Sequence, residues 1–371
     1  MAADVRYVAT ASAGGDGTTD ALSGANAAYA SMGSLIANYP NLDLVAAGDT
    51  LEIRCFGTVD TSGPNFQPFI TDATNFITIK ADRTKPDGFY DGTLSFSESH
   101  YHLKATGFVA LLRIRSYTVV DGLQVWQPGS SVNHFGIGIA QAAFGHQIRN
   151  CRIRGGGGTS IGIGLSNNHW CQVEAITNNL IFNCGTGVRG RNNVFAEIET
   201  WPCYNNTIWG CAVAGINVVS EQANTTALMK NNLFFDNASD IIEGGVSVTH
   251  IYDSNAGQDT PPVGETNTIT LGTLTDEMED PLAATGSEDV RPKSGGGAVG
   301  AGVGNSTDGD VPTTDILGNA RSTTAPTIGA FEISASGGGG GDVLPHGLHQ
   351  IENGNTGLSR ASHSIEEGFV A

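Results

Sequence analysis

The sequence CYNNTI at residues 203–208 contains the pattern that decides the fold: an apolar residue, an Asn two positions later, and another apolar residue beyond it. Related phrases occur as VVDGLQV at 119–125, IRNCRI at 148–153, ITNNLI at 176–181 and MKNNLF at 229–234. Their key positions follow at intervals of 29, 28, 27 and 26 residues and are Asp121, Asn150, Asn178, Asn205 and Asn231. A period of this length predicts a solenoid of stacked coils.

Short alternating segments lie between these phrases and predict β-strands. They are GIGI at 136–139, IGIGL at 161–165, GVR at 187–189 and GINV at 215–218. Two or three such strands with their turns fill one coil. The leucine spacing of a leucine-rich repeat is missing, and the period is too short for a propeller blade. The sequence therefore predicts an all-β protein, a single-stranded right-handed parallel β-helix.

The Asn or Asp at each key position has a structural explanation. A tight bend between strands needs a residue that tolerates left-handed backbone angles, and Asn tolerates them better than other non-glycine residues. Amides stacked on successive coils can also hydrogen-bond along the axis. We therefore predict that the five positions form a ladder of turn residues rather than a reactive site.

The N-terminal region, residues 1–49, contains the one convincing helical window. It covers residues 25–39, with an apolar face at Tyr29, Met32, Leu35, Ile36 and Tyr39, and ends before Pro40. An amphipathic helix here would cover the open apolar end of the solenoid. A strand is expected from the sequence GDTLEI at 48–53.

A helix followed by GDTLEI resembles the opening of many right-handed parallel β-helix proteins. The segments DILGNAR at 315–321 and IGAFE at 328–332 are similar to the closing motif of their last coil. The resemblance covers roughly residues 5–335 and implies a parallel β-helix over 50–335. In the closing motif, Asp315, Arg321 and Glu332 are expected to form a capping charge cluster. The resemblance implies no single function, because this fold occurs in lyases, glycosidases, adhesins and phage spikes.

Composition and charge narrow the expected partners. The chain has 51 glycines, only 18 Lys plus Arg, and a formal net charge of −19. The negative charge repels phosphate backbones, so no nucleic-acid partner is expected. No stretch has the apolar length that crosses a bilayer, so no membrane partner is expected either.

Cys184 and Cys211 each follow a turn Asn by six residues, which predicts a buried ladder of free thiols.

The first residues, MAADVRYV at 1–8, lack the basic region and apolar segment of a secretory signal. Either a signal segment has been removed from the sequence, or the protein leaves the cell by another route, such as release within a virus particle at lysis. The expected location is the surface of the virion.

Uronic-acid lyases of this architecture imply calcium held by carboxylates. The best local carboxylate clusters are Asp16 with Asp20, and Asp308 with Asp310, all in turn-rich segments where solvated Asp is ordinary. The sequence therefore predicts no cofactor, with calcium as the candidate ion if the chain were a lyase.

Glycosidases need two carboxylates that face one cleft. Glu174, Glu197 and Glu199 are the candidate catalytic residues, and Trp170 and Trp201 could stack on sugar rings. The structural alternative, which we favour, is a solvated sheet face with two half-buried tryptophans.

The C-terminal region predicts a flexible tail. Residues 336–341 form a glycine hinge. Residues 342–371 are too few to form a core alone and are expected to dock on a partner or to join subunits. The expected docking residues are Leu348, Ile351, Leu358, Ile365 and Phe369.

These observations favour a non-enzymatic protein on the surface of a phage particle: a head decoration, a head fibre or a tail-spike component. Its expected partners are other virion proteins and further copies of itself, with a homotrimer as the expected oligomer and host glycans as additional candidates. The alternative function is a glycan-cleaving or glycan-binding β-helix, either a polysaccharide lyase or a glycoside hydrolase.

Overall fold

The computed structural model describes residues 3–66, 68–107, 109–131, 134–139, 143–165, 171–192, 199–220, 225–245, 248–260, 265–283 and 287–333. The chain divides into two compact units, residues 1–335 and 336–371. The expected hinge and docking tail make up the second unit and lie outside the described residues. No described helix is long and apolar enough to cross a membrane.

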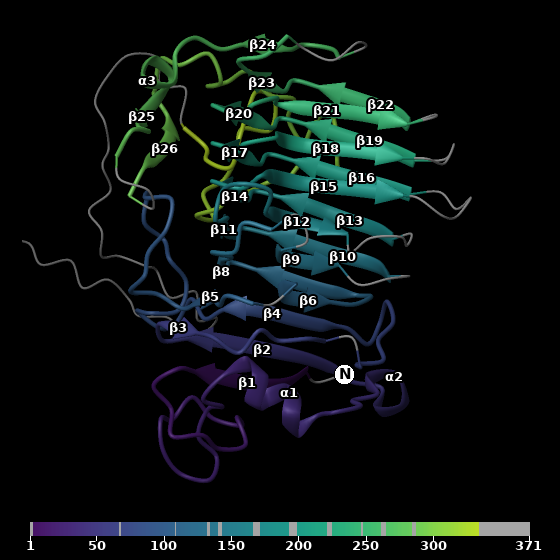
Figure 1. The fold of residues 1–371 in the computed structure, drawn as a ribbon, viewed down its shortest axis with the longest axis vertical. Coiled ribbons are helices and arrows are strands. Elements are labelled where there is room, and N and C mark those ends of the chain that lie inside the picture. The colour runs from purple at the N-terminus through teal and green to yellow at the C-terminus, as the bar shows by residue number, and fades with distance from the viewer. Residues whose placement is uncertain are drawn as a thin grey trace, which may run out of the picture. The chain divides into compact units, whose positions relative to one another are not determined.

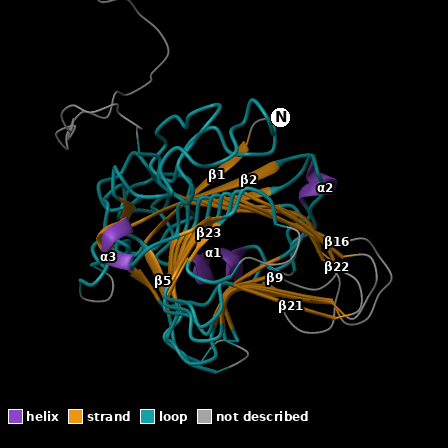
Figure 2. Ribbon diagram, turned by 90° about the horizontal axis from the view of Figure 1, so that it is seen from above, coloured by secondary structure: helices purple, strands orange, loops and turns teal. Residues whose placement is uncertain are grey.

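Three parallel sheets form the solenoid (Figures 1 and 2). The first sheet contains β1 (Ala3–Ala9), β2 (Thr50–Phe56), β4 (Ile77–Ala81), β7 (Thr118–Asp121), β10 (Ala143–Arg149), β13 (Cys171–Thr177), β16 (Glu199–Tyr204), β19 (Thr225–Lys230) and β22 (Val248–Asp253). The second contains β3 (Val59–Asp60), β5 (His102–Lys104), β8 (Gln124–Trp126), β11 (Arg152–Arg154), β14 (Leu180–Phe182), β17 (Thr207–Trp209), β20 (Leu233–Phe235), β23 (Ala256–Gly257) and β24 (Ile269–Thr270). The third contains β6 (Ala110–Ile114), β9 (Phe135–Ile139), β12 (Ile161–Leu165), β15 (Thr186–Asn192), β18 (Ala214–Ser220) and β21 (Ile241–Gly245). The predicted right-handed parallel β-helix is therefore confirmed.

The register of the paired strands places apolar residues of successive coils on top of one another inside the solenoid. In the second sheet each three-residue strand points its middle side chain inward, and the paired middle residues are Leu103, Val125, Ile153, Ile181, Ile208 and Phe234. All six are almost completely buried. A one-residue shift would turn this apolar column outward, so burial fixes the register of the coils.

The turn after the first sheet adopts the left-handed conformation expected of Asn. The φ angles of Asn150, Asn178, Asn205 and Asn231 lie between 55° and 56°. Asp121 does not belong to this column, because it is the last residue of β7 and pairs with Arg149. Gly122 occupies the turn of that coil instead, with φ of 72°. The ladder predicted from the sequence was therefore wrong by one position at its first coil.

A second column of asparagines, one residue further along, forms the axial ladder. The amide nitrogens of Asn179, Asn206 and Asn232 donate to the amide oxygen of the next coil at 2.9, 3.0 and 3.0 Å, and the series ends at Asn255. In the turn column, by contrast, the bond between side-chain amides of successive coils is Asn178 to Asn150 at 3.4 Å. Asn150 itself donates at 2.8 Å to the carboxylate of Asp121, the residue before the turn of the preceding coil. Most of the axial bonding therefore belongs to the neighbouring residue, not to the predicted one.

Every hydrogen-bonding group of the buried Asn206 amide has a partner. Its Oδ1 accepts from the Asn179 backbone N–H at 3.0 Å and from the Asn179 amide at 2.9 Å. Its Nδ2 donates to the Ile176 carbonyl at 2.8 Å and to Asn232 Oδ1 at 3.0 Å. Asn206 is completely buried. The ladder thus satisfies turn groups that water cannot reach.

The helix that covers the N-terminal end is shorter than predicted. α1 spans Met32–Asn38, and its N-cap is Ser31, whose side chain accepts from the Ser34 N–H. Residues before Ser31 cannot join the helix because Tyr29 exchanges backbone hydrogen bonds with the β1 region, including Tyr29 N–H to Tyr7 O at 2.8 Å. Met32 and Leu35 are buried in the main core, and Figure 2 shows α1 within the outline of the coils. The predicted capping helix is confirmed. A single-turn helix, α2 (Leu44–Ala47), precedes β2.

The coils end at β24, earlier than the predicted limit at residue 335, and residues 271–333 fold back along the second sheet. This segment includes α3 (Leu274–Glu277) and the antiparallel pair β25 (Met278–Asp280) and β26 (Asp289–Pro292). It covers outward apolar side chains of the sheet, among them Phe182 and Trp209, whose rings stack with centroids 4.6 Å apart. These side chains would otherwise form an exposed apolar stripe, which explains the return of the chain.

The described cysteines are free and buried: Cys55, Cys151, Cys184, Cys203 and Cys211. A hydrogen bond between the thiols of Cys184 and Cys211, with burial, raises the pKa of Cys184. Burial raises the pKa of Cys203 to about 12. The predicted buried thiols are confirmed at these positions, and such thiols are unreactive at neutral pH.

We predict that Asn206→Ala strongly destabilises the solenoid. The change removes the acceptor of the buried Asn179 backbone N–H and the side-chain donor to the Ile176 carbonyl, at about 1–3 kcal/mol for each group. The expected loss in the free energy of unfolding is therefore about 2–6 kcal/mol. Chemical denaturation followed by circular dichroism measures it. The matched control is Asn38→Ala at the exposed last residue of α1, expected to change stability by about 0.5 kcal/mol or less. Equal effects of the two variants would show that the ladder does not carry the fold.

Candidate functional site

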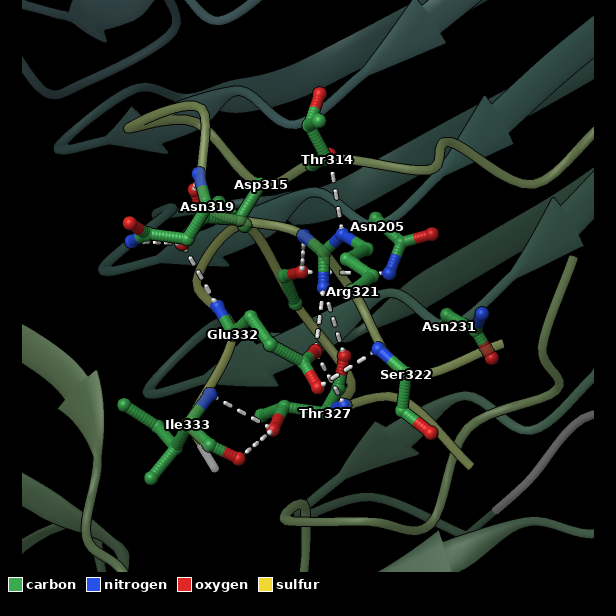
Figure 3. A network of polar contacts seen from close by, with 12 residues as sticks. Asn205, Asn231, Thr314, Asp315, Asn319, Arg321, Ser322, Thr327, Glu332 and Ile333 are labelled. Atoms are coloured by element: carbon green, nitrogen blue, oxygen red, sulfur yellow. Dashed lines mark hydrogen bonds and ion pairs between the residues drawn. The ribbon is translucent and has the colours of Figure 1, made fainter. Parts of the chain in front are cut away.

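Arg321 is the centre of a network of buried polar contacts (Figure 3). Its side chain is 1% exposed. The guanidinium donates to Asn178 Oδ1 at 2.9 Å and to the Gly329 carbonyl at 2.7 Å. Its further acceptors are the Thr327 carbonyl at 3.0 Å, the Thr314 carbonyl at 3.3 Å and Glu332 Oε2 at 3.4 Å. We call this network, with Asp315, Arg321 and Glu332, the C-terminal clasp.

The two carboxylates of the clasp bind backbone N–H groups. Asp315 Oδ1 accepts from Leu317 and Asn319 at 2.9 and 2.8 Å, and its Oδ2 accepts from the Glu332 N–H at 3.0 Å. Glu332 accepts from the backbone of Thr327 at 2.8 Å. Burial raises the pKa of Glu332 and lowers that of Arg321 to about 10. Asp315, Arg321 and Glu332 therefore lie together, as the sequence suggested, with their polar atoms committed to internal bonds.

The clasp does not close the last coil, as its resemblance to a terminal motif implied. It lies against the middle coils, where the turn asparagines bind it. Asn231 exchanges two side-chain hydrogen bonds with the Val303 backbone, both at 2.8 Å. The Gly329 N–H donates to the Asn231 carbonyl at 2.8 Å. Gly329 has φ of 102°, and a Cβ there would lie 2.7 Å from Thr207 Oγ1. Only glycine therefore permits this close approach.

The candidate glycan face is only partly within the described residues. Glu174 is exposed on β13 and is the extra residue of a β-bulge, because His146 pairs with Val173 and Gln147 with Ala175. Glu199 pairs through its backbone with Thr225. Glu197, Trp170 and the Glu199 side chain lie outside the described residues. The role of these carboxylates in glycan chemistry therefore stays a prediction.

Trp201, considered for stacking on sugar rings and predicted to be half-buried in the favoured alternative, is only 1% exposed and belongs to the main core. Its indole lies against Gly190, where an added Cβ would be 3.2 Å from the ring. A sugar cannot reach a ring in this position, so the proposed use of Trp201 in stacking was wrong.

The candidate calcium ligands have other partners. Asp16 accepts from the Thr18 N–H and hydroxyl at 2.9 and 2.7 Å. Asp20 pairs with Lys85 at 2.5 Å, and Asp308 pairs with Lys230. Within the described residues no group of three or more His, Cys, Asp or Glu side chains has the arrangement of a metal site.

His146 is a buried group that the sequence analysis did not single out. It lies on β10 with no exposed surface, and neither ring nitrogen has a hydrogen-bond partner among the described residues. Burial lowers its pKa to about 3. The imidazole is therefore neutral at ordinary pH and is buried within the solenoid.

The sequence analysis also missed a cavity at the last coils. Its volume is about 430 Å³, and it is bounded by the turn before β21, by β23 and by residues before β24. Asp240 lines it and is 7% exposed. Burial raises the pKa of Asp240 and of Glu265, a second lining residue. No repeat signal could have revealed this site, because it forms only where the repeat ends.

No protein-family model and no curated protein matches this chain. The structure therefore assigns it to the class of parallel β-solenoids through its geometry alone.

We predict that Arg321→Met releases the C-terminal segment. Removing one partner of a buried ion pair costs about 3–5 kcal/mol, because Glu332 is left charged and uncompensated. Limited proteolysis should then cut within residues 294–333 while the coils persist, and thermal unfolding should move to lower temperature. The control is Arg291→Met, which removes the more exposed Arg291–Asp289 pair, 2.7 Å long, and should cost about 1 kcal/mol or less. An unchanged cleavage pattern for Arg321→Met would contradict the proposed role of the clasp.

A second prediction concerns pH. Because the folded-state pKa of His146 is about 3 and its ordinary value is 6.5, only the unfolded chain takes up this proton between these values. Stability should therefore fall as the pH drops below about 6.5 and level off near 3. His146→Leu should remove this contribution and flatten the curve of stability against pH over that range. Parallel curves for the two proteins would refute the assignment.

Proposed function

We propose that this chain is a non-enzymatic structural protein of a phage particle surface, where its solenoid is the presented body. The observation that carries the proposal is the C-terminal clasp. The clasp contains three charged side chains, which are the residues of the closing motif best suited to chemistry. They instead form hydrogen bonds that hold the C-terminal segment against the coils. Such an arrangement stiffens a scaffold and offers no open reacting group.

Rigidity suits a protein that must hold a surface in a fixed orientation. The asparagine ladder joins successive coils, and the clasp joins residues more than one hundred positions apart, such as Arg321 and Asn178. Packed coils and satisfied buried polar groups leave few low-energy ways to open locally. The proposed role on the particle is therefore head decoration, head fibre or tail-spike component.

The proposed attachment uses residues 342–371, and the proposed partners are other virion proteins and further copies of this chain, in a homotrimer. Repeated weak contacts of tethered segments reinforce one another once the first has bound. The net charge of −19 keeps many copies soluble and mutually repelling except at their contact surfaces.

A glycan-cleaving or glycan-binding solenoid is the second candidate. One observation favours it: the Glu174 carboxylate is exposed on the first sheet, where a chain of sugars could reach it. Host glycans would then be the partner.

The deciding experiment compares the full chain with a version ending at residue 335. We expect the truncated protein to keep its β-type circular dichroism but to lose particle binding and its oligomeric mass in solution. A truncated protein that still binds particles with unchanged mass would overturn the proposed attachment.

A parallel assay of reducing ends and unsaturated uronates released from acidic polysaccharides tests the second candidate. The structural proposal predicts no release by the full chain. Release that is lost in a folded Glu174→Gln or Glu199→Gln variant would replace it with the enzymatic function.

A further inference from the structure

Lys230 and Asp308 form a side-chain contact between the coils and the returning C-terminal segment. Lys230 is the last residue of β19, and its ammonium group donates a hydrogen bond to Asp308 Oδ2. The two side chains are only 15% and 19% exposed, compared with 28% and 50% in the Lys85–Asp20 pair. The centre of the Tyr204 ring lies 5.8 Å from the ammonium nitrogen. The Lys230–Asp308 contact is therefore largely screened from water, unlike an ordinary surface ion pair.

Both side chains extend from backbone that hydrogen bonds hold in place. β19 lies between β16 and β22 in the first sheet, so Lys230 is paired on both sides. The Asp308 N–H donates to the Gly304 carbonyl at 3.0 Å. Asn231, the residue after Lys230, holds the Val303 backbone through the two hydrogen bonds described above. The fold therefore keeps an amine and a carboxyl group in fixed proximity.

These two groups can condense to an amide. The pair begins as an ammonium and a carboxylate: burial raises the pKa of Asp308, the hydrogen bond from Lys230 lowers it, and the net shift is downward. Transfer of one proton from Nζ to Oδ2 gives the amine and the carboxylic acid, and burial favours this transfer because neutral groups lose less solvation.

The bond changes balance without any further reactant. The amine nitrogen of Lys230 attacks Cγ of Asp308, a C–N bond forms, and the bond from Cγ to Oδ2 breaks. Oδ2 leaves as water with two protons that came from Nζ, and one proton remains on the amide nitrogen. Well-oriented groups within one molecule reach effective molarities of about 10⁵–10⁸ M, which favours this condensation.

The backbone of Asp310 is placed to stabilise the intermediate. Its N–H donates at 3.1 Å to Asp308 Oδ1, the carboxylate oxygen that is not bonded to Lys230. Negative charge develops on this oxygen when the amine attacks. A fixed N–H donor at that position lowers the barrier in the manner of an oxyanion hole.

We propose that Lys230 Nζ and Asp308 Cγ form an intramolecular isopeptide bond, which fastens the C-terminal segment covalently to the first sheet. The bond forms in the folded chain without another enzyme. This inference goes beyond the proposed structural function and does not depend on it.

The bond closes a covalent loop between Lys230 and Asp308, which restricts the unfolded chain. Lys230→Arg keeps the positive charge but removes the amine that forms the bond. This variant should therefore unfold at a lower temperature than the cross-linked chain.

The test is the mass of the full chain under denaturing conditions, compared with the mass of its sequence. We expect the loss of one water molecule, and no loss in Lys230→Arg or Asp308→Ala. A tryptic digest should contain a branched peptide with both residues and no cleavage after Lys230. Lys85→Arg is the matched control, because it changes the more exposed ion pair and should keep the water loss.

The same measurement separates the isopeptide from a succinimide at Asp308-Gly309, which also forms with loss of water. Loss of water that persists in folded Lys230→Arg identifies the succinimide and overturns the proposal. A folded wild-type chain with the full mass of its sequence, or with cleavage after Lys230 and no branched peptide, overturns it as well. Circular dichroism checks that each variant is folded.

The rate of water loss tests the role of Asp310. The full chain is made by cell-free synthesis and its mass is followed over time. Asp310→Pro removes the backbone N–H and should slow the loss by about 100-fold or more. Asp310→Ala keeps the N–H and should react at an unchanged rate. Equal rates in the two folded variants would contradict the assigned stabilisation of the intermediate.

Discussion

The fold depends on one constraint: the backbone groups of each buried turn must be hydrogen-bonded without water. The asparagine ladder meets it. Asn206 and Asn232 each use the amide oxygen twice and the amide nitrogen twice. Asn179, at the start of the ladder, uses its oxygen once and its nitrogen twice. The side chains thus replace water at turns inside the core. Because each amide bonds to the coil above it, a ladder position constrains the register of the neighbouring coils as well as its own turn.

The turn column beside the ladder has a different task. Asn178, Asn205 and Asn231 adopt left-handed angles, which leaves their amides free to bind the returning C-terminal segment. The same segment covers the outward apolar residues of the second sheet. Two adjacent residues thus have different roles. The ladder residue bonds successive coils to each other, and the turn residue before it bonds the C-terminal segment to the coils.

The clasp and the cavity at the last coils differ in the state of their charges. In the clasp, Arg321 and Glu332 form an ion pair and also bind backbone groups. In the cavity, all charged side chains among the described lining residues are acidic, and burial raises the pKa of Asp240 and of Glu265. The paired network of the clasp stabilises the body of the solenoid.

The sequence by itself determined the solenoid, the coil period and the left-handed turn residues, because these depend on a local pattern repeated in every coil. The pairs Asn178-Asn179 and Asn205-Asn206 include the residues that form the ladder, but the local sequence does not show which Asn of each pair points inward. Only the tertiary structure decided which Asn points inward, whether Trp201 is buried and where the clasp lies. The clasp, for example, depends on a single contact between Arg321 and Asn178, which are 143 residues apart. Such contacts occur once, so no repeated pattern encodes them. The cavity at the last coils belongs to the same class, since it exists where the repeat stops.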